Sequence, residues 1–136
     1  MSTAIRAVRM PSYVVSIALL AIMDLALRFL GFARSVAISR FLAGRRGGTI
    51  QDRRQVLPIA ERLARAAVVY PGRALCLEQS LALFVLLQRR GIAAELRLGV
   101  QPYPFNAHAW VELDGQPVNE TWETIRQFVP MQEFVV

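Results

Sequence analysis

The chain has 136 residues, of which 54% are hydrophobic and 19% are charged, and its formal net charge is +6. This length suits one domain with a real core, and the hydrophobic share excludes a disordered chain. The single cysteine cannot form an internal disulfide, so nothing indicates an oxidising compartment, and we expect a cytoplasmic protein.

The positive charge lies in the first half of the sequence. Residues 1–75 carry twelve arginines and three acidic residues, for a net charge of +9, whereas residues 76–136 carry four arginines and seven acidic residues, for −3. A basic surface attracts acidic partners, so we expect an acidic peptide or an acidic protein. The arginines are dispersed among apolar residues without a nucleic-acid-binding motif, and no nucleic acid partner is expected.

Residues 1–43 are strongly apolar and predict helix. The stretch from Tyr13 to Phe32 imitates a membrane span, but its uncharged segment, Tyr13 to Met23, is too short to cross a bilayer about 30 Å thick. Asp24 and Arg28 have the i,i+4 spacing of a helical ion pair. We expect a helix packed on the core and no stable membrane span. Whether this helix also docks a partner protein, or touches a membrane surface weakly, stays open.

Two prolines set the predicted helix boundaries in the next segment. Because a helix tolerates proline only in its first turn, Pro58 predicts a short helix from Ile50 to Gln55 and a second helix that starts near Pro58 and ends before Pro71. The second helix carries apolar residues at helical spacing, namely Ile59, Leu63, Ala66, Ala67 and Tyr70. Residues 1–70 are therefore expected to be helical, apolar and basic.

The stretch from Pro71 to Gly91 predicts one helix with the only cysteine, Cys76, near its first turn. Gly91 stands at the C′ position, directly after two arginines that suit the negative end of a helix. The positive end of a helix stabilises a thiolate, which is the nucleophilic form of cysteine. Taken alone, however, Cys76 favours the more common role of a small buried side chain.

Two stretches alternate between apolar and other side chains, as half-buried strands do. They are Ala94–Val100 and Ala107–Leu113, and the second carries the only histidine, His108, on the face opposite its alanines. Asp114-Gly115 predicts a hairpin turn, and residues 116–121 predict a return strand. Residues 122–136 indicate a short helix or turn with an apolar tail. The pattern predicts an α+β fold with a helical N-terminal half packed on a small antiparallel sheet.

A cysteine and a histidine that act together need a third group to orient the imidazole, and Glu120 and Asn119 are the candidates. Side chains directly opposite on antiparallel strands share a face. A two-residue Asp-Gly turn would bring Asn119 to the face of His108. A three-residue loop, Leu113–Gly115, would bring Glu120 opposite His108 instead, and this register is preferred.

Three motifs carry a resemblance to a known family. They are Cys-Leu-Glu-Gln-Ser-Leu-Ala-Leu from Cys76, the Arg-Arg-Gly-Ile end of the helix, and Ala-His-Ala-Trp-Val-Glu-x-Asp-Gly-x-Pro-Val-Asn from Ala107. Together they resemble the transglutaminase-like B2 proteins of lasso peptide biosynthesis, which are cysteine peptidases that remove a leader peptide. The resemblance covers Pro71 to Thr121 and implies a papain-like or transglutaminase-like core.

The resemblance also implies roles for residues and partners. The nucleophile would be Cys76 and the base His108, and Glu120 stands where the family usually has an aspartate. The implied partners are the leader segment of a precursor peptide, a separate leader-recognition protein and a lasso cyclase. We expect a single domain, 1–136, with a helical region 1–70, a catalytic core 71–121 and a tail 122–136.

Aromatic residues near His108 are candidates for substrate binding. Tyr103 and Phe105, in the proline-containing loop before the His108 strand, could line a substrate groove or simply cap a loop. Trp110 shares the face of His108 and could wall the site, although core packing is the stronger interpretation for it.

Two other functions remain open. A transglutaminase-like acyltransferase would use the same cysteine and histidine with an amine as acceptor, whereas an adaptor would use the apolar helices and no chemistry. An approach of Cys76 and His108 within about 4 Å would favour an enzyme. One cysteine and one histidine cannot supply a typical zinc shell, and no phosphate-binding glycine loop is present, so no metal or cofactor is expected.

Overall fold

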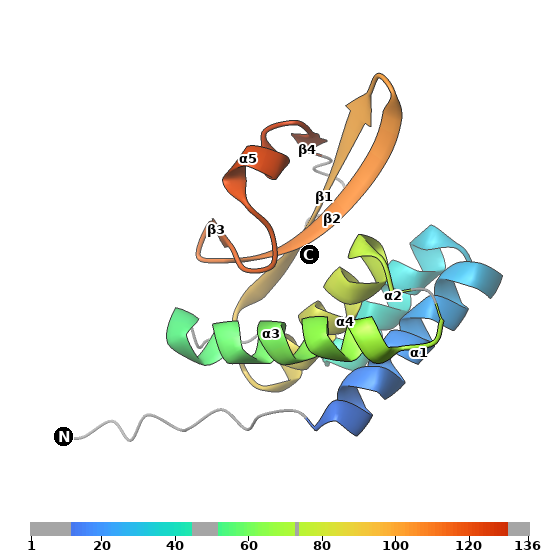
Figure 1. The fold of residues 1–136 in the computed structure, drawn as a ribbon, viewed down its shortest axis with the longest axis vertical. Coiled ribbons are helices and arrows are strands. Elements are labelled where there is room, and N and C mark those ends of the chain that lie inside the picture. Colours follow the sequence, from blue (N-terminus) through green and yellow to red (C-terminus); the bar gives the residue numbers. More distant parts are fainter. Residues whose placement is uncertain (1–11, 45–51, 73, 131–136) are drawn as a thin grey trace.

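The computed structural model describes residues 12–44, 52–72 and 74–130, without the side chains of Pro102 and Phe105. Figure 1 shows helices gathered at one end and a long β-hairpin rising from them. In chain order the elements are α1 Tyr13–Phe29, α2 Phe32–Ala43, α3 Arg53–Val69, α4 Cys76–Arg89, β1 Ala94–Pro102, β2 Phe105–Leu113, β3 Gln116–Pro117, α5 Trp122–Ile125 and β4 Val129–Pro130. The strands form one antiparallel sheet in the order β3-β2-β1-β4, so the predicted α+β fold is confirmed.

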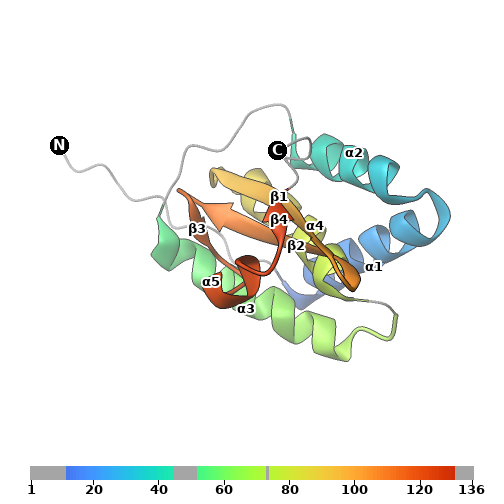
Figure 2. The ribbon, with the colours of Figure 1, turned by 90° about the horizontal axis from the view of Figure 1, so that it is seen from above.

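Helix α4 is the centre of the core. Every residue from Ser80 to Leu87 is buried, because α1, α2 and α3 pack around it and the sheet covers it from another side. Seen from above, α2 and α3 lie on either side of α4 (Figure 2). A helix that is apolar all round needs such a position. From Ser80 to Leu87 the structure buries the whole circumference of this helix.

The apolar N-terminal segment forms two helices rather than one. Gly31, with φ of 85°, separates α1 from α2 in a left-handed conformation that suits glycine. The predicted ion pair is present, with Arg28 Nε 2.9 Å from Asp24 Oδ1. Leu20 and Met23 of α1 enter the core. No helix in the described ranges is long and apolar enough to span a membrane.

Helix α3 runs unbroken past Pro58, so the predicted split at this proline is wrong. The helix starts after Asp52, whose Oδ1 accepts a hydrogen bond from the Arg54 backbone at 3.0 Å. Pro58 is exposed, so water can serve the Arg54 carbonyl that lacks a helical donor, while Val56, Ile59 and Leu63 hold the other face in the core. Of the predicted helix 50–55, Ile50 and Gln51 lie outside the described residues.

The predicted start of the cysteine helix is also wrong. Helix α4 begins at Cys76 rather than Pro71, and Glu78 Oε2 accepts a hydrogen bond from the Leu75 backbone N–H at 3.1 Å just before the first turn. Such a bond satisfies a donor that a helix start otherwise leaves unpaired. The predicted end is confirmed, because Gly91 follows the helix with φ of 79°.

The hairpin β1–β2 is longer than the alternation indicated. Its pairing runs from Ala94 opposite Leu113 to Pro102 opposite Phe105, so only two residues form the turn. Strand β4 pairs with β1 at Gly99 and Val100, and it was not predicted because two residues show no periodicity. Residues 131–136 of the predicted tail lie outside the described residues.

The return strand differs most from its prediction. Leu113 pairs with Gln116, so the turn at Asp114-Gly115 has two residues and the preferred three-residue loop is wrong. Both turn residues have positive φ, as such a turn requires. Strand β3 then ends at Pro117. The Val118 backbone N–H still donates to the Val111 carbonyl at 2.8 Å, but the Val111 N–H donates to the Asn119 side chain and not to a backbone carbonyl. Residues 118–121 therefore leave the sheet, contrary to the predicted strand 116–121.

Candidate active site

Cys76 is the first residue of α4 and is partly buried. The N–H groups of a first helical turn have no partner inside the helix, so they point toward whatever lies beyond it. Ser80, one turn later on the same side of α4, donates from Oγ to the Ala109 carbonyl at 2.9 Å. This bond fixes the start of α4 against β2 beside His108.

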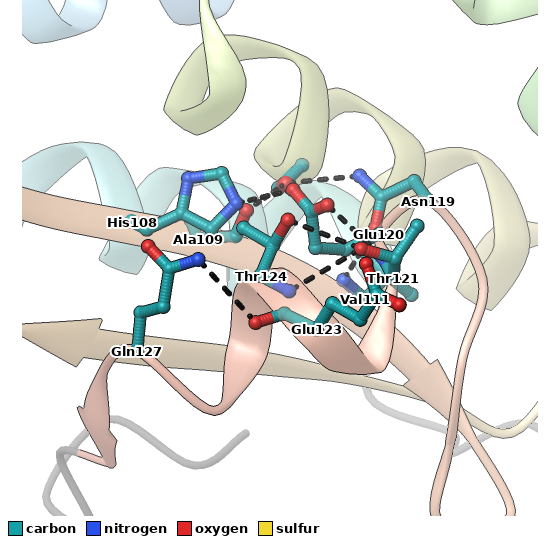
Figure 3. A network of polar contacts seen from close by, with 10 residues as sticks. His108, Ala109, Val111, Asn119, Glu120, Thr121, Glu123, Thr124 and Gln127 are labelled. Carbon is teal, nitrogen blue, oxygen red and sulfur yellow. Dashed lines mark hydrogen bonds and ion pairs between the residues drawn. The ribbon is translucent and has the colours of Figure 1, made fainter.

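His108 and Glu120 are in direct contact. His108 Nε2 lies 2.5 Å from Glu120 Oε2, and the two side chains are 15% and 19% exposed (Figure 3). The second carboxylate oxygen, Oε1, accepts a hydrogen bond from the Thr121 backbone N–H at 2.9 Å. The contact forms because the chain leaves the sheet after Pro117 and turns back over β2, not because of the predicted strand register.

The surroundings of Glu120 keep it ionised. Burial raises the pKa of this carboxyl, but the hydrogen bonds from the Thr121 backbone and from His108 outweigh burial and hold the pKa below its ordinary value. An ionised carboxylate only accepts hydrogen bonds, so the shared proton sits on Nε2 of His108. Nδ1 is then the ring nitrogen that can accept a further proton.

Asn119, the alternative orienting residue, does not contact the imidazole in the described structure. Its Oδ1 accepts from the Val111 backbone N–H at 2.8 Å, and its Nδ2 donates to Ser80 Oγ at 3.1 Å. Asn119 thus takes the place of the strand that ends at Pro117 and ties the loop to both β2 and α4. Of the two candidates, Glu120 is the one that meets His108.

Two aromatic rings pack against the imidazole. Phe128, which follows α5, stacks on His108 with 5.1 Å between ring centroids and 24° between planes. Trp110 lies 6.1 Å away and is only 2% exposed, in line with its predicted core packing, and its Nε1 has no hydrogen-bond partner among the described residues. Phe128 escaped the sequence analysis because a single aromatic residue in a tail without periodicity carries no signal.

The other two predicted substrate-binding residues, Tyr103 and Phe105, precede His108 in the chain. Tyr103 is 89% exposed in the turn at the tip of the β1–β2 hairpin, whereas His108 lies three residues, roughly 10 Å, along β2 from its first residue. Phe105 begins β2, but its side chain lies outside the description. Their role in substrate binding stays a prediction.

Cys76 and His108 lie on two elements that pack together. Among the described residues no hydrogen bond joins their side chains, although Ser80 and Ala109 link α4 to β2. Catalytic hydrogen bonds are often long in a free enzyme and tighten only with substrate. The structure therefore contains a hydrogen-bonded His108–Glu120 pair, and Cys76 is the first residue of the helix that packs beside it.

Comparison with known proteins agrees with this arrangement. The family model of the transglutaminase-like superfamily matches residues 19–133. The chain is also 47% identical over 45 residues to the microcin J25-processing protein McjB of Escherichia coli, a match that covers 33% of this chain and 22% of that protein. No solved structure matches the chain. The chain belongs to the transglutaminase-like superfamily.

Proposed function

We propose that this protein is a cysteine peptidase that removes the leader from a lasso peptide precursor. The observation that carries the proposal is the His108–Glu120 pair beside a helix that begins with the only cysteine. The likeness to a microcin-processing protein supports the same conclusion, although it spans about one-fifth of that relative's length.

In this mechanism His108 acts as the base for Cys76. Glu120 occupies Nε2, so Nδ1 accepts the thiol proton and a thiolate–imidazolium pair forms. Glu120 holds the ring in the required orientation and stabilises its positive charge. Phe128 and Trp110 pack against the ring, restrict its rotation and keep water from it.

The reaction follows thiol chemistry. The Cys76 thiolate attacks the carbonyl carbon at the leader–core junction, and backbone N–H groups at the start of α4 stabilise the oxyanion. The imidazolium of His108 gives its proton to the departing core amine as the C–N bond breaks. The leader stays on Cys76 as a thioester, which water then hydrolyses.

The proposed setting includes further proteins. A separate leader-recognition protein would deliver the precursor, and a lasso cyclase would use the freed core amine. We expect the three proteins to act in the cytoplasm, on a ribosomally made peptide.

Substitution of the two reacting groups tests the proposal. Cys76→Ala and His108→Ala should each abolish leader cleavage, because one removes the nucleophile and the other its base. Mass spectrometry of a precursor incubated with the protein and the recognition protein measures cleavage, and circular dichroism checks that each variant folds. Cleavage by Cys76→Ala at a rate near that of the wild type would show that the protein is not a cysteine peptidase.

The same assay distinguishes a peptidase from the alternative function, a transglutaminase-like acyltransferase. An added primary amine would become joined to the leader at the expense of the free acid if the thioester prefers an amine to water. A peptidase gives the free leader acid throughout.

A further inference from the structure

Three hydrogen bonds join the elements that carry the proposed catalytic groups. Ser80 Oγ donates to the Ala109 carbonyl at 2.9 Å and accepts from Asn119 Nδ2 at 3.1 Å. Asn119 Oδ1 accepts from the Val111 backbone N–H at 2.8 Å (Figure 3). Ser80 lies on α4, its two backbone partners lie on β2, and Asn119 lies in the loop after β3. We call these contacts the Ser80–Asn119 network.

Each proposed catalytic group is next to one residue of this network. His108 directly precedes the residue whose carbonyl accepts from Ser80, and Glu120 directly follows Asn119. Cys76 is four residues before Ser80, so the two lie on the same side of α4, one turn apart. Ser80 is therefore the point at which the three backbone segments that hold the nucleophile, the base and the orienting carboxylate meet.

The bonding of Ser80 is unusual for a buried helical serine. A serine inside a helix often donates to a carbonyl of its own helix, as Ser39 Oγ does with the Val36 carbonyl in α2 at 2.7 Å. Ser80 is equally buried but bonds across to β2 and to the loop. Apolar packing is non-directional, whereas hydrogen bonds fix direction and distance. The network therefore defines one position of α4 relative to β2 and the loop.

We propose that Ser80 and Asn119 are positioning residues of the peptidase, whose bonds set the approach of Cys76 to Nδ1 of His108 and keep Glu120 on Nε2. Reacting groups tolerate little displacement, because an error of about 1 Å costs roughly a hundredfold in rate. This inference rests on the proposed function.

The kinetics of precursor cleavage test the network. Ser80→Ala should lower kcat about tenfold or more and leave KM near the wild-type value, because the fully buried Ser80 cannot contact substrate. Asn119→Ala should lower kcat by about threefold, because Asn119 is exposed and water can replace part of its bonding. Circular dichroism checks that both variants fold, and Asn119→Ala alone decides if Ser80→Ala does not fold.

The matched control is Ser39→Ala. Ser39 is also fully buried and also donates to a backbone carbonyl, but within its own helix, so this variant should keep the wild-type kcat and KM.

A second measurement needs no substrate. His108 is the only histidine of the chain, so selective labelling of histidine with nitrogen-15 reports on one imidazole in the nuclear magnetic resonance spectrum. In the wild type at alkaline pH the ring should hold its proton on Nε2 and give two well-separated nitrogen signals. Ser80→Ala and Asn119→Ala should bring these signals closer together, as the proton becomes shared between the two tautomers, whereas Ser39→Ala should leave them unchanged.

Wild-type kcat together with wild-type nitrogen signals in the folded variants would overturn the proposal, and so would a rise in KM with unchanged kcat. Failure of the wild type to cleave any precursor would instead count against the proposed function. The nitrogen signals would then still decide whether the network holds His108 on Glu120.

Discussion

Glu120 uses its two carboxylate oxygens for different tasks. Oε2 meets His108, while Oε1 accepts the Thr121 backbone N–H at the point where α5 begins. The backbone therefore holds the carboxylate in the position from which it orients the imidazole. Glutamate has one more methylene than the aspartate usual in the resembling family, and the loop after Pro117 supplies the geometry that accommodates it.

Glu120→Gln should lower the rate of leader cleavage strongly, by about a hundredfold or more in kcat. The amide keeps the size of the side chain but removes the negative charge that stabilises the imidazolium. Single-turnover cleavage of the precursor measures the effect. Glu123→Gln, an exposed glutamate three residues later, is the matched control and should keep the wild-type rate. An effect as small as that of the control would remove Glu120 from the mechanism.

The lowered pKa of Glu120 also predicts how its contribution to stability depends on pH. The folded pKa lies below the ordinary value of 4.5, so ionised Glu120 stabilises the fold above that pH, and this stabilisation is lost as the pH falls through the folded pKa. The free energy of unfolding of Glu120→Gln should be lower than that of the wild type at pH 6, and the gap should narrow as the pH falls below 4.5. Urea denaturation at several pH values measures it. A gap that does not change as the pH falls below 4.5 would contradict the ionised state.

The sequence could indicate this site only in part. Cys76 and His108 stood out because each is the only residue of its type, and Glu120 followed from a motif. The route by which Glu120 reaches His108 depends on where β3 ends, and that in turn depends on the Asn119–Val111 bond, which no local pattern shows. Phe128 reaches the imidazole only through tertiary packing.

At the scale of the elements, α1 holds the segment that leads into α4. Asp24 is only 3% exposed and accepts hydrogen bonds from Arg28 Nε at 2.9 Å and from the Tyr70 hydroxyl at 2.8 Å. Burial and the Asp24 bond raise the pKa of Tyr70 above its ordinary value. Gly72 packs so closely that a Cβ there would lie 2.4 Å from Asp24 Oδ2. This junction fixes the chain four residues before Cys76.

Tyr70→Phe should lower the free energy of unfolding by about 1–3 kcal/mol, since it removes a hydrogen bond to a buried carboxylate. Urea denaturation measures the change. Tyr103→Phe is the matched control, because Tyr103 is exposed at the hairpin tip, and it should stay within about 0.5 kcal/mol of the wild type. Equal stability of the two variants would show that the Tyr70–Asp24 bond contributes nothing.

Elements with strong periodicity were predictable and those without it were not. The cysteine helix and the two long strands carry enough apolar residues to specify their type, although packing sets their ends. Pro58 misled the sequence analysis because helix α3 gains more from burying Val56, Ile59 and Leu63 than it loses at one exposed carbonyl. Local helix propensity does not include this stabilisation by tertiary packing.

On the whole molecule, α1 presents a second apolar face to solvent. Val14, Ala18, Ile22, Leu25 and Phe29 recur at helical spacing and are all exposed. Arg28, Arg34 and Arg40 are exposed on α1 and α2, whereas Asp24, which is buried, is the only acidic residue in these two helices. A contiguous apolar face with basic neighbours marks an interaction site for a partner with an acidic rim around an apolar centre.

We expect the leader-recognition protein to bind this face. Leu25→Asp and Phe29→Asp should each weaken binding about tenfold or more, because burial of one such side chain contributes about 1.5–3 kcal/mol. Both residues are more than half exposed, so the fold should persist. Phe41→Asp, at an exposed position on α2 outside this apolar face of α1, is the control and should bind like the wild type.

Calorimetry with the purified recognition protein measures affinity, and sedimentation with anionic vesicles tests the membrane alternative. Wild-type affinity in both the Leu25→Asp and Phe29→Asp variants would show that the recognition protein does not bind the apolar face of α1. Salt-resistant pelleting with vesicles when the recognition protein is present would show that this face binds a membrane instead.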